Sequence, residues 1–147
     1  MTSMWTYRAR RTLAVAGFSL AGVLLASQAQ AQGQSAAAAT GDYLFRTYCA
    51  ACHGASAKGD GPLADSMRKR PSDLTEIAKR NKGMFPRELV QKMIDGREPV
   101  KGHGGPDMPV WGDVFARSAG GDDPGIVQKR IESLVAYLEG IQAKTAY

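Results

Sequence analysis

A single short motif, Cys49-Ala50-Ala51-Cys52-His53, places the strongest constraint on how this 147-residue chain can fold. It contains both cysteines of the sequence and one of its two histidines. If the motif runs along a helix into a turn, Cys49 and Cys52 are three residues apart and project from one side of the backbone. His53 follows directly, so one turn presents two thiols and an imidazole to a single ligand.

Cys-x-x-Cys-His is the attachment pattern of a c-type haem. We therefore expect one haem c, bound covalently through Cys49 and Cys52, with His53 as a ligand of the iron. A structural zinc site needs about four ligands, so His103 would have to complete it. A thioredoxin-like dithiol would lie near a βαβ pattern, and the sequence shows no strand-like alternation. A disulfide across so short a loop would gain little closure entropy.

The first 31 residues have the pattern of a secretory signal peptide. Three arginines (Arg8, Arg10 and Arg11) precede an apolar run over residues 13–26, and Ala29-Gln30-Ala31 is a small-x-small cleavage site. We expect cleavage after Ala31 and a periplasmic protein. The apolar run is short for a membrane span, which needs about 20 residues. An uncleaved membrane anchor is the alternative, and only that form would bind a membrane.

The rest of the chain has the size of one domain, preceded by a flexible leader over residues 32–40 that is rich in Ala, Gln, Gly and Ser. The net charge of +5 overstates the basic character of this part. Three of the 19 basic residues lie in the signal peptide, which leaves 16 against 14 acidic residues. No basic run carries interleaved aromatic residues, so we expect no nucleic-acid partner.

Apolar periodicity predicts helices over residues 41–52, 74–80, 86–95, 111–117 and 124–141. Thr40 or Asp42 can cap the first of them, Ser72 or Asp73 the second, and Gly96 can end the third. The loop between the third and fourth helices holds His103 and Met108. The last helix has one apolar face, made by Val127, Ile131, Leu134, Val135 and Leu138.

A helix ending in Cys-x-x-Cys-His, a late Met108-Pro109 and a final amphipathic helix together resemble a class I cytochrome c. The resemblance covers the whole mature chain and is closest to small bacterial periplasmic or oxidase-associated haem-c domains. It implies an all-α fold over residues 41–147, with three to five helices wrapped around one covalently bound haem. The motifs that carry it are Cys49-Ala-Ala-Cys-His-Gly54, Gly59-Asp-Gly-Pro62, Pro71-Ser-Asp-Leu-Thr75 and Met108-Pro-Val-Trp-Gly112.

The resemblance also implies that the first and last helices cross near a right angle. Gly41 and Phe45 match the crossing positions on the first helix, and Tyr137, with Leu134 and Leu138, matches the partner face on the last.

The resemblance also indicates the two axial ligands of the iron. His53 is the proximal ligand through Nε2, and its other nitrogen should donate to a backbone carbonyl. The resemblance implies that Pro62 supplies this carbonyl. Met108 is the expected distal ligand, and a thioether there raises the reduction potential. His103, five residues earlier, is the main alternative.

Several other side chains leave more than one role open. The methionines Met67, Met84 and Met93 are weaker candidates for the distal position than Met108 or His103. Trp111 either packs beside the haem, or bonds a haem propionate, or belongs to the ordinary core. Arg70 and Lys101 either pair with haem propionates or are solvated charges.

A haem with both axial positions filled is suited to outer-sphere electron transfer. We expect an electron carrier rather than an enzyme, either free or as the haem subunit of an oxidoreductase. A dehydrogenase or quinol-oxidising complex would be the donor, and a terminal oxidase or reductase the acceptor. The alternative is a sensor or peroxidase in which a labile Met108 admits a gas or peroxide. No distal acid–base pair supports that alternative except through His103.

Overall fold

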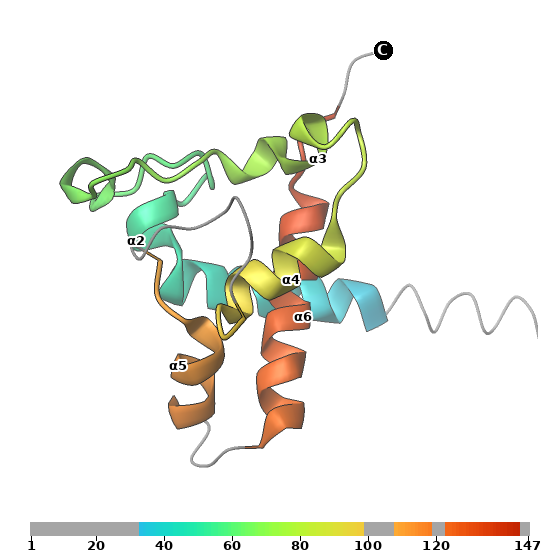
Figure 1. Cartoon of the computed structure of the whole chain (residues 1–147). Helices are drawn as coiled ribbons and strands as arrows, with labels where there is room; N and C mark the ends of the chain where they lie inside the picture. Colours follow the sequence, from blue (N-terminus) through green and yellow to red (C-terminus); the bar gives the residue numbers. More distant parts are fainter. Residues whose placement is uncertain (1–32, 99–107, 119–122, 145–147) are drawn as a thin grey trace, which may run out of the picture. The chain divides into compact units, whose positions relative to one another are not determined.

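The computed structural model describes residues 33–98, 108–118 and 123–144 (Figure 1). The chain divides into two compact units, Met1–Ser35 and Ala36–Tyr147, and the second contains the motif. The described residues form helices and no strand, so the predicted all-α fold is confirmed.

The signal peptide, its cleavage site and His103 lie outside the described residues. None of the described helices has the length and apolar character needed to span a membrane.

The first helix begins earlier than predicted. Residues 33–48 are helical, although residues 32–40 were expected to form a flexible leader. The alanines at positions 36–39 explain the difference, because alanine has the highest intrinsic helix propensity. Thr40 is consequently inside the helix rather than its cap, and its hydroxyl donates to the Ala36 carbonyl at 3.1 Å.

The same helix also ends earlier than predicted, because a turn at Cys49 interrupts it. A separate short helix, α2 (Ala50–His53), follows with Cys49 at its N-cap. The single helix expected over residues 41–52 is therefore two. Among the described residues this gives six α-helices where three to five were expected.

The remaining helices form close to their predicted positions, and local capping explains where they begin and end. Asp73 accepts from Thr75 N, Gly96 ends α4 with φ +71°, and Asp123 accepts from Gly125 N at 2.8 Å. The elements are η1 (Ala64–Ser66), η2 (Leu74–Glu76), α3 (Ile77–Arg80), α4 (Arg87–Asp95), α5 (Trp111–Ser118) and α6 (Pro124–Gly140).

The first helix crosses α6, as the sequence predicts (Figure 1). Gly41 is buried at the crossing, and a Cβ there would lie 2.7 Å from Tyr137 Cβ and closer still to the Ser133 carbonyl oxygen. One turn further along, the rings of Phe45 and Tyr137 are 5.2 Å apart between centroids. The close approach of the two backbones therefore depends on glycine.

Helices α4 and α5 pack against α6 and against each other. Their shared core contains Val90, Ile94, Phe115, Val127 and Ile131, all buried. Burying side chains of this size stabilises a fold by about 2 kcal/mol each. This core places the start of α5, and with it residues 108–110, beside α4.

Candidate functional site

The Cys49–His53 motif forms one tight turn of backbone. The amides of Cys52 and His53 both donate to the Cys49 carbonyl, at 3.1 and 2.8 Å. Both cysteines are free thiols in the structure, so the disulfide alternative is not realised. Two thiols and one imidazole are thus presented from a single turn, as the spacing predicts.

A glycine-rich turn binds the carbonyls of this motif. The amides of Gly59, Gly61 and Leu63 donate to the carbonyls of His53 (2.8 Å), Cys52 (3.2 Å) and Ala51 (2.9 Å) respectively. We call residues 59–63 the amide cradle. Since Gly54 N also donates to the Ala50 carbonyl, every carbonyl from residue 49 to residue 53 accepts a hydrogen bond. The motif is therefore held by backbone bonds on its carbonyl side.

Glycine is required at two positions of this arrangement. A Cβ on Gly61 would lie 2.5 Å from the Ala51 carbonyl oxygen and 2.7 Å from that of Ala50. Gly59 has φ +75°, and a Cβ there would meet the Pro71 carbonyl. Residues 59–62 were singled out in the sequence only as part of the family resemblance, and their contact with the motif was not predicted. The two glycines around Asp60 were the only signal for such a close approach.

Residues 70–74 join the cradle to the segment that follows His53. Arg70 Nε donates to the Gly59 carbonyl at 3.2 Å, and Leu74 N donates to the Ala57 carbonyl at 2.7 Å. Arg70 also lies 3.9 Å from an Asp65 carboxylate oxygen. Arg70 therefore has a structural contact that neither of its two expected roles included.

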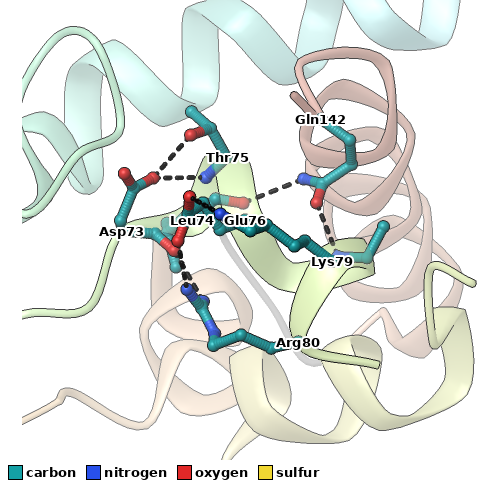
Figure 2. A network of polar contacts seen from close by, with 8 residues as sticks. Asp73, Leu74, Thr75, Glu76, Lys79, Arg80 and Gln142 are labelled. Atoms are coloured by element: carbon teal, nitrogen blue, oxygen red, sulfur yellow. Dashed lines mark hydrogen bonds and ion pairs between the residues drawn. The ribbon is translucent and has the colours of Figure 1, made fainter. Parts of the chain in front are cut away.

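Gln142, two residues after α6, fixes the next part of this segment (Figure 2). Gln142 Nε2 donates to the Leu74 carbonyl at 2.8 Å, and its Oε1 accepts from Ala78 N at 2.8 Å. On the far side, Asp73 Oδ1 accepts from Thr75 N at 2.8 Å and Thr75 Oγ1 at 2.6 Å. Gln142 was not singled out in the sequence, because a lone glutamine after a helix carries no pattern.

Burial dominates the electrostatics of the motif. It raises the pKa of the Cys49 thiol to about 12, and the neighbouring Cys52 adds to the increase. It lowers the pKa of His53 below 6.5, while a backbone interaction at Ser72 partly opposes this. His53 is therefore neutral at pH 7, the form in which an imidazole binds a metal.

The Nδ1 atom of His53 is buried and has no hydrogen-bond partner among the residues that the structure describes. The predicted bond from this nitrogen to the Pro62 carbonyl is thus not formed. Pro62 lies between Gly61 and Leu63, whose amides bind the Cys52 and Ala51 carbonyls. A buried nitrogen without a partner is uncommon, and this one is not Nε2, the atom expected to bind the iron.

Met108 lies at the start of the segment that leads into α5, and it is partly buried. Three residues later, the Trp111 ring contacts that of Tyr48, the neighbour of Cys49, with centroids 5.6 Å apart. Phe115 contacts both rings, at 5.4 and 5.8 Å. This aromatic cluster (Tyr48, Trp111 and Phe115) ties the Met108 segment to the motif. Trp111 therefore packs against the core, and a contact with the haem stays a prediction.

Two other methionines are less suitably placed than Met108 to be the distal ligand. Met84 is 68% exposed, and Met93 lies partly buried on the apolar stripe of α4. His103 lies outside the described residues.

Residues 36–138, more than half of the chain, match the family described as Cytochrome C oxidase, cbb3-type, subunit III. This chain belongs to that family of c-type cytochrome domains. The match covers the motif, the amide cradle, Met108 and most of α6. The cytochrome has no significant match among curated proteins or solved structures. Membership of the family implies haem c and a role in electron transfer.

The residues of this cytochrome fit a haem. The donor set around the motif is two free thiols and a neutral, partly buried imidazole, and a thioether on Met108 lies in a segment packed against Tyr48. Within the described ranges, no three His, Cys, Asp or Glu side chains are grouped to hold a metal ion, so no zinc site is seen there.

Asp73 gives this cytochrome a specific acid sensitivity. Its hydrogen bond from Thr75 lowers the pKa of the Asp73 carboxyl below 3.8. A lowered folded-state pKa stabilises the fold at pH values above the unfolded-state pKa, and this stabilisation is lost as the pH falls through the folded-state pKa.

We expect Asp73→Asn, which keeps the accepting oxygen, to lose less stability than wild type when the pH falls from 5 to about 3. Urea unfolding of the holoprotein across this range measures the difference. Equal pH dependence of the two proteins would contradict the assignment.

Proposed function

We propose that this chain carries single electrons on one haem c, attached by thioether bonds from Cys49 and Cys52 and held axially by His53 and Met108. We place the mature protein in the periplasm, after cleavage following Ala31. The observation that supports the proposal most directly is the motif turn itself. It presents two free thiols and a neutral imidazole from one turn, and the amide cradle fixes the backbone that carries them.

The haem would supply a metal centre that changes oxidation state by one electron. The chain's own residues supply its coordination and its surroundings. His53 is uncharged at neutral pH because it is buried, so it needs no deprotonation before it binds. An uncharged Met108 thioether favours ferrous over ferric iron and raises the potential. With both axial positions held, the site has no open position for a substrate, which favours a carrier over an enzyme.

The family name supports a redox partner in an oxidase complex. We infer that the acceptor is a terminal oxidase or another terminal reductase, and the donor a dehydrogenase or quinol-oxidising complex. A free carrier and a haem subunit need the same site. A free carrier would meet its partners through small, transient interfaces.

Carbon monoxide binding to the ferrous protein tests the axial ligands. We expect the wild-type spectrum to change only slowly, because Met108 holds the sixth position. We expect Met108→Ala to bind carbon monoxide rapidly, and the control Met84→Ala to behave as wild type because Met84 is 68% exposed. Retention of a closed site in Met108→Ala, with opening in His103→Ala, would assign His103 instead.

Two further results would change the proposal. Rapid carbon monoxide binding by the wild-type protein would favour a sensor or peroxidase. An intact residue Met1 in the mature protein, measured by mass spectrometry, would replace the soluble carrier by a membrane-anchored one.

A further inference from the structure

The last turn of α4 lies directly against the segment that carries Met108. Gly96, which ends α4, has φ +71°, and a Cβ there would lie 3.2 Å from Val110 Cα. Val110 is two residues from Met108 and begins the first turn of α5, since its carbonyl accepts from Val114 N at 3.2 Å. The end of α4 and the beginning of α5 therefore fix each other.

An ion pair at this point covers Gly112. Arg97 Nε donates to Asp95 Oδ1 at 2.5 Å, and Arg97 Nη2 donates to Asp95 Oδ2 at 2.7 Å, so the pair is held at two points. A Cβ on Gly112 would lie 2.5 Å from Asp95 Oδ1 and 2.6 Å from Arg97 Nε. Gly112 is buried, and only glycine leaves room for the pair.

The charges around the pair favour its ionised form. The hydrogen bond from Arg97 lowers the pKa of Asp95, and the Asp95 carboxylate raises that of Arg97. Asp113, the residue after Gly112 in α5, also raises the pKa of Arg97. The Asp95 side chain is 22% exposed, so solvent screens the pair only in part.

The opposite side of the same segment is held by the aromatic cluster, through Trp111 against Tyr48. Residues 108–112 thus run between two fixed contacts, one to Tyr48 at the end of the first helix and one to α4. We propose that the Asp95–Arg97 pair, seated on Gly112, is a latch that positions residues 108–112 and limits how often Met108 leaves the iron. Asp95 and Arg97 are then positioning residues. The inference rests on the proposed function, because it requires Met108 to be the distal ligand.

Gly112→Ala tests the latch most directly. Alanine favours the α5 helix, but its Cβ would displace the Asp95–Arg97 pair. We expect the ferrous holoprotein to bind carbon monoxide about five to ten times faster than wild type at saturating gas, the range for loss of one charge-assisted contact. Gly140→Ala is the matched control, since a Cβ on Gly140 meets nothing within 4 Å.

Asp95→Asn is a second variant that keeps the side-chain shape and removes the charge. We expect it to raise the carbon monoxide rate about fivefold, and to add little in a Gly112→Ala background because both changes act on one contact. Asp42→Asn is its control, because it weakens a different pair, with Arg46 on the first helix.

The outcomes separate the latch from the proposed function. Wild-type carbon monoxide rates in Gly112→Ala and Asp95→Asn, with rapid binding in Met108→Ala, would overturn the latch and leave Met108 as ligand. An unchanged rate in Met108→Ala would overturn both. Faster binding in the two latch variants, with both controls at the wild-type rate, would support the latch.

Discussion

Gly41→Ala is expected to destabilise the holoprotein by about 3 kcal/mol, the upper range for forcing extra volume into a packed core. The added Cβ would lie 2.7 Å from the Ser133 carbonyl carbon and 2.7 Å from Tyr137 Cβ, and closer still to the Ser133 oxygen. These atoms belong to the α6 backbone or are bonded directly to it, so they cannot move without displacing α6. The two helices would have to separate and open the Phe45–Tyr137 contact.

Thermal unfolding followed by circular dichroism measures this effect. A loss of this size should lower the midpoint by roughly 10–20 °C in a domain of about 100 residues. Gly140→Ala is again the control, because it makes the same chemical change on α6 in open space. Its midpoint should stay the same or rise slightly. A Gly41→Ala protein as stable as this control would show that the crossing is looser than the structure indicates.

Gly61→Ala is expected to have the largest effect on the haem site. Its Cβ would lie 2.5 and 2.7 Å from the carbonyl oxygens of Ala51 and Ala50, which are part of the motif backbone. The cradle would move away and lose the Gly61–Cys52 and Leu63–Ala51 hydrogen bonds. Leaving two backbone carbonyls without partners and straining the turn costs about 2–4 kcal/mol.

The measurements are haem content per polypeptide and urea unfolding of the purified protein. We expect Gly61→Ala to be less stable and to carry haem in a smaller fraction of molecules. Ser66→Ala, an exposed change just after the cradle, should match wild type in both. The cradle has no such role if Gly61→Ala carries full haem and unfolds at the wild-type urea concentration.

The parts of the fold that the sequence predicts are those decided by nearby residues. Asp123 and Pro124 begin α6 and Gly96 ends α4 because capping depends on a few adjacent positions. The apolar face of α6 is likewise read from its period, and the Gly41–Tyr137 crossing follows from the family pattern. The early start of the first helix was missed because composition suggested a linker, whereas four alanines favour a helix.

The contacts that hold the site could not be predicted, because they join residues distant in sequence. Gln142 donates to the Leu74 carbonyl across 68 positions of the sequence. No sequence pattern in either segment indicates that the two are in contact. The amide cradle is made of backbone groups, which the sequence letters do not distinguish. The Asp95–Arg97 pair is local, but its contact with Gly112 depends on how α4 and α5 pack. The motif itself was evident because three side chains within five residues define it.

The crossing of the first helix with α6 has a consequence for the order of events during biosynthesis. Gly41 and Ser133 are about ninety residues apart, so their contact closes a loop that includes the whole motif. No ribosome-bound or partly translocated chain can form this contact before α6 has emerged. Until then Cys49 lacks the packed surroundings that bury it and raise its pKa. Because α6 follows the motif by about seventy residues, the two thiols remain unburied for an interval during synthesis.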